Sequence, residues 1–368
     1  MKLEHSWRMP AEWALHQCCW IAWPCREATF HGRFEEAKRE VAAVARSIAS
    51  AEKVKLLVRG TDFKEATQLC GPAVNLVKFE LSDSWTRDSG PSFVLNKLHE
   101  LAGVDWYFNA YGSLPLQEDG SPVSDPEFNN DQTLAKRILK SEEISRLIAP
   151  LVLEGGSIHV DGSGTLLTTE QCLLSRNSRK TQLEIEGLLS EFLGISRTIW
   201  LGEGLQDDET NGHVDNLACF VKERVVLALN CEDSLDPNYE PLKDNLRRLR
   251  LATDAQGRSL EVFTINQPPA AFRRNGDRLS QSYLNFYLAN GAVICPAFGY
   301  PTEDEAAVEQ LKSLFSNRRV IQVPISNLIH GGGGIHCITQ QQPFGRNSVS
   351  HKTFLLQTSP AHFMGYVA

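Results

Sequence analysis

Residues 217–229 read LACFVKERVVLAL, in which two apolar runs flank the charged tripeptide KER. Short runs rich in β-branched residues and joined by a polar turn predict a β-hairpin. The same form recurs at residues 157–169 and 283–295, whose turns contain Gly-Ser-Gly and Asn-Gly. This repeated hairpin decides the fold class of the chain.

Each hairpin is followed by a helical pattern and then by a further β run. The helical patterns cover residues 180–193, 240–251 and 303–314, and the β runs cover 197–201, 260–265 and 320–323. Alternating helices and strands indicate the α/β class, and the hairpins add antiparallel pairing to it. Units of this length are typical of radially repeated folds. We expect one domain over residues 1–368, with repeated hairpin-helix-strand units around a central axis.

The N-terminal part of the chain carries a related alternation of helices and strands. Its apolar spacing predicts strands at 21–23, 54–58, 73–79 and 104–109, and helices at 34–51, 61–70 and 131–149, the last ended by Pro150. No linker rich in proline or serine interrupts the chain. The single-domain prediction therefore extends to this part as well.

Composition places the chain among ordinary globular proteins. Of its 368 residues, 42% are hydrophobic and 22% are charged, and the formal net charge is −8. An acidic balance argues against nucleic-acid or anionic-membrane binding and favours a small cationic ligand. Nine cysteines without a CxxC spacing, no secretory-signal pattern and no apolar run of membrane-spanning length predict a cytoplasmic protein.

Four glycine-containing segments are more polar than their β surroundings. They are SWTRDSGP at 84–91, LEGGSIHVD at 153–161, DDETNGHVDN at 207–216 and HGGGGIHCIT at 330–339. In a radial fold, the loops of successive units meet at one end of the central axis. Residues from all four segments can therefore share one site.

The last of these segments places a cysteine after four consecutive glycines. A glycine run marks a sharp bend or the close approach of a ligand, and residues 335–339 suggest a short strand that fixes the Cys337 thiol. A cysteine becomes a nucleophile as the thiolate, which needs a cationic or hydrogen-bonding partner. The alternative is a tight turn in which Cys337 is a small buried apolar residue.

Two of the other segments offer groups that would complement such a cysteine. His213 and Asp215 would point to the same face of a strand, where they could serve as a general acid/base and a cation-holding acid. Asp88 would face the cationic part of a ligand, while Trp85 would cover its apolar part. The alternatives are a polar loop at 207–216 and a structural ion pair of Asp88 with its neighbour Arg87.

Glu154 ends an apolar run before two glycines, where an unpartnered carboxylate would be costly to bury. Its alternative is a solvated position at a hairpin entrance. The acidic groups together suit a guanidinium, a planar donor that paired carboxylates match. Cys337 would attack the guanidinium carbon, and His213 would protonate the departing ammonia and then activate water. We expect His159 and His336 to be core histidines outside this catalytic set.

The polar segments resemble the signature blocks of the agmatine deiminases, in the Porphyromonas-type peptidyl-arginine deiminase family of the pentein superfamily. The similar blocks are 85–91, 154–162, 212–218 and 332–343, with 9–13 and 23–24 near the N-terminus. The resemblance implies a pentein fold, a pseudo-fivefold α/β propeller around a central active site. It also implies hydrolysis of agmatine to N-carbamoylputrescine and ammonia in putrescine and polyamine biosynthesis, with no metal and no organic cofactor.

The resemblance also implies a catalytic role for five residues of this chain. Cys337 is then the nucleophile and His213 the general acid/base. Glu154 orients His213 and shares the substrate guanidinium. Asp88 and Asp215 hold guanidinium nitrogens.

Three more residues are expected to bind substrate, and two positions depart from the family pattern. Trp85 would border the aliphatic chain, and Asp208 or Glu209 would hold the cationic substrate. Gly334 stands where asparagine is usual before Ile-His-Cys. Tyr111 stands where tryptophan is more usual before glycine.

Other functions remain open at this level. A relative of the same superfamily could deiminate another guanidine, such as peptidyl-arginine, or transfer the amidino group to an amine. A zinc hydrolase is disfavoured because the chain lacks HExxH and CxxC spacings. A non-catalytic binding protein would be expected to lack some of the catalytic residues. The expected partner is a small cationic guanidine, with no nucleic acid and no membrane, and a homo-oligomer is left open.

Overall fold

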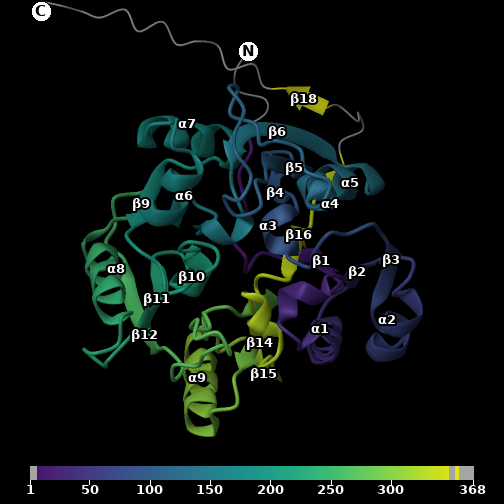
Figure 1. The fold of residues 1–368 in the computed structure, drawn as a ribbon. Helices are drawn as coiled ribbons and strands as arrows, with labels where there is room; N and C mark the ends of the chain where they lie inside the picture. The colour runs from purple at the N-terminus through teal and green to yellow at the C-terminus, as the bar shows by residue number, and fades with distance from the viewer. Residues whose placement is uncertain (1–5, 348–352, 356–368) are drawn as a thin grey trace, which may run out of the picture.

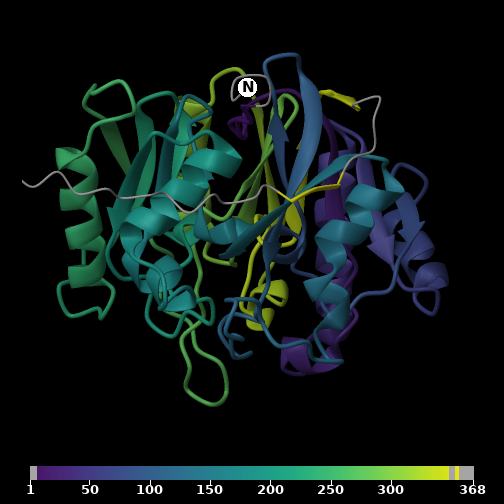
Figure 2. The ribbon, with the colours of Figure 1, turned by 90° about the horizontal axis from the view of Figure 1, so that it is seen from above.

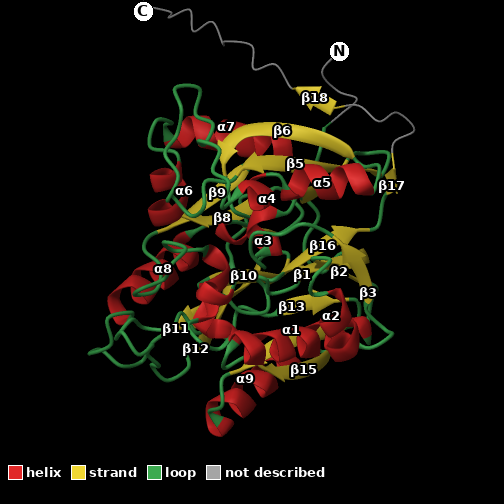
Figure 3. Cartoon of the chain, turned by 45° about the vertical axis from the view of Figure 1, so that its right-hand side comes forward, coloured by secondary structure: helices red, strands yellow, loops and turns green. Residues whose placement is uncertain are grey.

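The computed structural model describes residues 6–347 and 353–355. Within these residues the chain forms a mixed α/β fold with five separate sheets. Helices lie on the outside of the sheets, while the short helix α3 (Thr86–Ser89) lies near the middle of the molecule (Figures 1 and 3). The α/β class predicted from the repeated hairpins is confirmed.

The first sheet brings a strand from the later part of the described chain next to strands from its earlier part. Its order is β16 (Thr339–Pro343), β1 (His16–Ala22), β2 (Val54–Val58) and β3 (Asn75–Lys78). A second sheet has the order β17 (Arg346–Asn347), β5 (Glu100–Tyr107), β6 (Ser145–Val152) and β18 (Thr353–Leu355), with β4 (Ser92–Leu95) also paired to β5. Strand β16 pairs antiparallel with β1 and follows directly on the cysteine-containing segment.

The other three sheets each contain one predicted hairpin and one later strand. They are β7 (His159–Val160), β8 (Thr165–Thr169) and β9 (Arg197–Leu201); β10 (Ala218–Lys222), β11 (Val225–Asn230) and β12 (Glu261–Asn266); and β13 (Tyr287–Ala289), β14 (Ala292–Ala297) and β15 (Arg319–Pro324). In each sheet the hairpin strands are antiparallel and the later strand is parallel to its neighbour. The repeated unit read from the sequence is therefore confirmed in all three places.

The longer helices connect successive strands of the same sheet. They are α1 (Phe34–Ala49), α2 (Phe63–Cys70), α5 (Leu134–Ser141), α6 (Glu170–Arg176), α7 (Gln182–Leu193), α8 (Tyr239–Leu251) and α9 (Pro301–Leu314), besides the short α4 (Asn129–Gln132). Single 3₁₀ turns lie at η1 (Glu27–Phe30), η2 (Gly155–Ser157), η3 (Val214–Asn216) and η4 (Leu328–Gly331). In the view from above, α8 and the α1–α2 pair lie on opposite sides of the sheets (Figure 2).

Helix α7 shows why these boundaries follow from the sequence. Thr181 and Glu184 form a capping box at its start, which satisfies two amides that the helix leaves free. Gly194 ends it with φ of 71°, a conformation that glycine adopts without strain. Side chains of the helix facing β6 are buried. The helix therefore begins and ends where the sequence supplies the caps.

The predicted helix over 131–149 is wrong in its second half. Helix α5 ends at Ser141, and residues 145–152 form β6, in which buried and partly buried residues alternate. Pro150 lies inside this strand rather than after a helix. The pairing of β6 with β5 skips from Ala149 to Val152, so the missing amide of Pro150 costs no ladder hydrogen bond.

Two further findings concern the whole described chain. All nine cysteines are free and buried. Among the residues with described positions, no helix combines the length and the apolar character needed to span a bilayer.

Candidate active site

Cys337 lines a small pocket and is 3% exposed. Asn285 Nδ2 donates to its Sγ at 3.2 Å, and Asp215 Oδ2 lies 3.6 Å from the same sulfur. The N–H of Arg87, in α3, donates to the carbonyl oxygen of Cys337 at 3.1 Å. Three distant segments thus fix the position of this sulfur.

The strand expected over residues 335–339 is not formed before Thr339. Residues 335–338 make a turn, because the Thr339 hydroxyl donates to the carbonyls of Ile335 and His336, both at 2.9 Å. The Thr339 amide also donates to His336 O at 3.1 Å. Cys337 is therefore presented on a turn at the start of β16, and not on a regular strand.

The glycine run allows close packing around this turn. A Cβ on Gly333 would lie 2.6 Å from the Trp85 ring and 2.9 Å from Cys337 Cβ. A Cβ on Gly334 would lie 2.6 Å from Asn285 Oδ1, whose amide group also contacts the thiol. The glycine at 334, where the resemblance leads one to expect asparagine, leaves room for Asn285 in this arrangement.

His213 and Asp215 also lie on a turn rather than on the predicted strand. Residues 214–216 form η3, and strand β10 begins only at Ala218. The turn still brings both side chains to one place, because a Cβ on Gly156 would lie 2.6 Å from His213 Nδ1 and 2.9 Å from Asp215 Oδ2. The proximity is as predicted, but its cause is the turn and the glycine that packs against it.

Glu154 lies near the Nε2 atom of the His213 ring, whereas Asp88 lies near its Nδ1 atom. Its Oε2 is 3.8 Å from His213 Nε2, and its Oε1 accepts a hydrogen bond from Arg176 Nε at 2.8 Å. All three side chains are buried. Burial opposes ionisation of Glu154, but His213 and Arg176 lower its pKa to about 2. The carboxylate is thus charged and paired, and is not the solvated group of the alternative interpretation.

Asp88 forms the other carboxylate neighbour of His213, with Oδ1 at 3.7 Å from Nδ1. Its Oδ1 accepts from the Gly156 amide at 3.0 Å, and its Oδ2 accepts from the Tyr111 hydroxyl at 3.0 Å. Asp88 makes no ion pair with Arg87, which instead lies 3.4 Å from Glu12. The structural ion-pair alternative for Asp88 is therefore not supported.

The pocket above Cys337 has a volume of about 40 Å³. Its lining comprises Trp85, Asp88, Tyr111, Glu209, Thr210, Gly331, Gly332, Gly333 and Cys337. Trp85, which was predicted to border the aliphatic chain of a substrate, lines this pocket. Glu209 lines the mouth with a 46% exposed side chain and pairs with Arg273 at 2.6 Å.

The Asp208 carboxylate does not line the pocket and binds backbone amides instead. Its Oδ1 accepts from the Thr210 amide at 3.0 Å, and its Oδ2 accepts from the Gly212 amide at 2.9 Å. The carboxylate holds the turn that leads into His213 and is not part of the pocket lining. Asp208 and Glu209 were both predicted as acids that could hold a cationic substrate. Of these two, Glu209 alone lines the pocket.

A buried ionic network lies behind Asp215. The His336 ring bridges two carboxylates, with Nδ1 at 2.9 Å from Asp215 Oδ2 and Nε2 at 2.8 Å from Glu12 Oε1. Arg87 and His159 approach Glu12 at 3.4 and 3.7 Å. His336 is thus a buried histidine whose two ring nitrogens both have hydrogen-bond partners, as expected of a core histidine. The sequence did not reveal these partners, because Glu12 is 324 positions away.

Replacing His336 with leucine is expected to destabilise the fold by about 3–5 kcal/mol, because it leaves Glu12 and Asp215 as buried charges without their bridge. Although burial opposes it, His336 is the main cause that lowers the pKa of both carboxylates. Urea unfolding would measure the difference, with the exposed His31→Asn as the matched control. A loss below about 1 kcal/mol would show that the bridge does not stabilise the charged pair.

The electrostatics of the site disfavour ionisation of the Cys337 thiol. Burial, followed by Asp215 and Asp88, raises the pKa of Cys337 well above its ordinary value. Burial opposes protonation of His213, but Asp88 and then Cys172 and Glu154 raise its pKa well above the usual range. The site therefore holds a neutral thiol, an imidazolium and charged carboxylates.

Among the residues that the structure describes, one group of side chains could hold a metal ion. Glu154, Cys172 and His213 each offer a ligand atom, and these atoms lie within 4.8 Å of one another. The same carboxylate already receives the Arg176 guanidinium at 2.8 Å, so a divalent cation would meet a like charge there. This donor set favours an ion-paired histidine over a metal centre.

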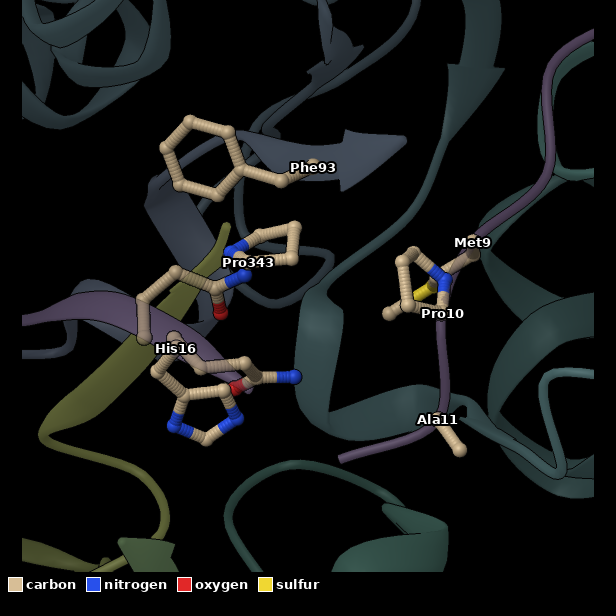
Figure 4. Close-up of a pocket in the computed structure, with 8 residues that line it drawn as sticks. Met9, Pro10, Ala11, His16, Phe93 and Pro343 are labelled. Atoms are coloured by element: carbon tan, nitrogen blue, oxygen red, sulfur yellow. The ribbon is translucent and has the colours of Figure 1, made fainter. Parts of the chain in front are cut away.

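A second cavity, of about 10 Å³, lies between the N-terminal segment and β16. Figure 4 shows Met9, Pro10 and Ala11 on one side of it and His16, Phe93 and Pro343 on the other. This volume suits about one water molecule. Its lining contains no cysteine, so the pocket at Cys337 is the better candidate for catalysis.

Comparison with known proteins agrees with this arrangement. The family model for Porphyromonas-type peptidyl-arginine deiminase matches residues 8–343. A relative from Legionella pneumophila strain Paris is 44% identical and covers 92% of this chain and 96% of its own. The agmatine deiminase of Medicago truncatula is 39% identical, with 92% and 97% covered. The solved agmatine deiminase of Enterococcus faecalis aligns with a TM-score of 0.85 at 34% identity, covering 92% of this chain and 96% of that one. The chain belongs to the Porphyromonas-type peptidyl-arginine deiminase family.

Proposed function

We propose that the protein is an agmatine deiminase, which converts agmatine and water to N-carbamoylputrescine and ammonia. The observation that carries this proposal is a buried thiol 3.6 Å from the carboxylate of Asp215, in a pocket that Asp88 also lines. A guanidinium carbon placed over this sulfur would have carboxylates available for its nitrogens. The names of similar proteins add support for agmatine as the substrate.

Substrate binding would activate the nucleophile. Cys337 is neutral in the free site because burial and the carboxylates Asp215 and Asp88 disfavour a further negative charge. A bound guanidinium offsets these carboxylates and so lowers the pKa of the thiol. The thiolate would then form, with its proton released to solvent because His213 is already protonated, only when an electrophile is in place. This order protects the thiolate from other reactions.

The reaction would proceed in two covalent stages. Attack by the Cys337 thiolate on the guanidinium carbon gives a tetrahedral adduct. The His213 imidazolium donates a proton to one nitrogen, which leaves as ammonia, and an amidino thioether remains on Cys337. The neutral imidazole then takes a proton from water as water attacks the same carbon. Collapse of the second adduct expels the thiolate, which takes up the remaining hydroxyl proton, and forms the carbonyl of N-carbamoylputrescine.

Glu154 supports both stages in this proposal. Its carboxylate lies 3.8 Å from His213 Nε2 and is anchored by Arg176 at 2.8 Å. It would hold the ring in place and stabilise the imidazolium that donates to ammonia. Trp85 would border the butyl chain of the substrate. Glu209, at the mouth of the pocket, would receive the distal ammonium, with Arg273 tempering its charge.

The remaining features are proposed on the same basis. The five sheets would be the blades of a pseudo-fivefold pentein propeller with the active site at its centre. Residues 1–368 would form one catalytic domain, since one apolar cluster reaches from Cys19 to Ile338. Nine free cysteines support a reducing cytoplasm. The chemistry needs no metal and no organic cofactor, and the partner is a small cationic guanidine of the polyamine pathway rather than nucleic acid or membrane.

A substrate panel tests the proposed function. Agmatine, free arginine and an amide-blocked arginine would each be incubated with the enzyme, with ammonia measured and the product identified by mass spectrometry. We expect N-carbamoylputrescine from agmatine and a preference over both arginine substrates of at least about a hundredfold in kcat/KM. Turnover of blocked arginine without turnover of agmatine, or transfer of the amidino group to an added amine, would overturn the assignment.

A further inference from the structure

Tyr111 is a pocket residue whose role the sequence left open. It follows strand β5 in a loop where Ala110 and Tyr111 both have positive φ, of 51° and 56°. Two consecutive non-glycine residues in this region are unusual, and such strain is commonly found at functional positions. The loop is held by the Asn109 side chain, which accepts from the Gly112 amide at 2.9 Å. The backbone therefore maintains a strained geometry that directs this ring into the pocket.

The ring is fixed on two sides. Phe108 packs edge-on against it with ring centroids 5.3 Å apart, and the His213 ring lies at 6.1 Å. Gly112 follows without a Cβ, and an added Cβ would lie 3.2 Å from the Arg176 guanidinium that pairs with Glu154. Tyr111 thus packs against the same cluster that holds the general acid/base.

The hydroxyl of Tyr111 donates to Asp88 Oδ2 at 3.0 Å. Because the Gly156 amide donates to Oδ1 at 3.0 Å, each carboxylate oxygen is fixed by one donor. An ionised carboxylate has acceptor positions left on both oxygens. The acceptor positions that remain free on Asp88 have fixed directions, because the carboxylate cannot turn without breaking its hydrogen bond to Tyr111 or to Gly156.

We propose that Tyr111 is the positioning residue for Asp88, and that through it the enzyme selects guanidines whose terminal nitrogens carry only hydrogen. A fixed carboxylate accepts well from an unsubstituted amidino end. A methyl group on that nitrogen would remove a donor and leave a buried acceptor unpaired, which is a costly mismatch. A carboxylate free to turn would lose this discrimination. The inference rests on the proposed deiminase function and adds the substrate class to it.

Asp88 also gives the proposal a pH-dependent signature. The groups that face it are His213, Asp215, Glu154 and Cys337, besides the Tyr111 hydroxyl. Burial, against the opposing charge of His213, raises the pKa of Asp88 to about 6. Since kcat/KM reports the free enzyme, it should fall below about pH 6 as Asp88 becomes protonated. The Tyr111 hydroxyl donates to the ionised form, so its removal should raise this pKa further.

The test compares wild type, Tyr111→Phe and the control Tyr107→Phe. The kcat/KM for agmatine is measured from acidic to mildly alkaline pH, and that for Nω-methylagmatine on the plateau. In Tyr111→Phe we expect the acid limb to move up by about one pH unit and the preference for agmatine over the methylated substrate to fall about tenfold. The control should match the wild type in both, because no described contact links Tyr107 to Asp88.

Both readouts are independent of the fraction of folded enzyme, since one is a midpoint and the other a ratio. A Tyr111→Phe variant with the wild-type limb and the wild-type ratio would overturn the proposal while leaving the deiminase function intact. Failure of the wild type itself to release ammonia from agmatine would instead overturn the proposed function. The two failures are therefore distinguishable in one experiment.

Discussion

Cys337→Ala is expected to lower the turnover of agmatine by at least about 10⁴-fold, with the fold retained. The thiol is the nucleophile in the proposed chemistry, and no other thiol lines the pocket. Its removal also deletes a small group from a turn that is held by backbone hydrogen bonds to Arg87 and Thr339. Ammonia release measured under saturating agmatine would give the rate, and thermal unfolding would check the fold.

Cys231→Ser is a suitable control, because Cys231 is a buried cysteine outside the pocket and its thiol donates to a backbone carbonyl, as a serine hydroxyl can. We expect wild-type turnover from it. Acid quench of the wild type followed by mass spectrometry should reveal an adduct of agmatine minus ammonia on Cys337 alone. Turnover of Cys337→Ala within tenfold of wild type, or an adduct on another residue, would contradict covalent catalysis by this thiol.

The repeated hairpins were predictable because they are local. The runs at 217–229 and 283–295 contain both strands and their turn, so side-chain period and turn residues specify them without reference to the rest of the chain. The helix and the third strand of each unit follow within a few tens of residues. Local patterns of this kind are sufficient to predict the α/β class.

The errors occur where tertiary contacts override local preference. Residues 145–149 belong to the helical pattern predicted from 131, yet they lie in β6, which pairs with β5 on one side and with β18 on the other. His213 and Asp215 lie on a turn because the Asp208 carboxylate holds the amides of Thr210 and Gly212. Neither the strand partner nor the capping acid could be identified from the local sequence.

The site shows a similar division. The motif residues Asp88 and Cys337 line one pocket, and Glu154 lies 3.8 Å from His213. The residues that complete their surroundings come from outside these segments: Glu12, Tyr111, Arg176 and Asn285. A buried arginine or glutamate gives no sequence signal of its partner when the partner is far along the chain. The departure at Tyr111 was visible, but its contact with Asp88 required coordinates.

His213→Asn is expected to lower turnover of agmatine by about 10³-fold, since the ring is needed to protonate the leaving nitrogen and then to deprotonate water. Asparagine cannot do either, although it retains a polar group between Asp88 and Glu154. With agmatine, the variant should stall before the covalent adduct, because an amine is a poor leaving group without a proton. Rapid acid quench with mass spectrometry should therefore show unmodified enzyme.

The role of His213 as the base that activates water can be tested apart from its role as an acid. The test uses a substrate whose leaving group departs without being protonated. The S-methylisothiourea analogue of agmatine loses methanethiol and gives the same amidino thioether on Cys337. The wild type should turn it over, whereas His213→Asn should form the adduct and retain it, because no base then activates water. His31→Asn, at an exposed position with φ of 48° that asparagine tolerates, should behave as wild type. Hydrolysis of the adduct by His213→Asn at the wild-type rate would show that another group, such as Asp215, serves as the base. Accumulation of the adduct would instead assign both proton transfers to the His213 imidazole, which lies between Glu154 and Asp88.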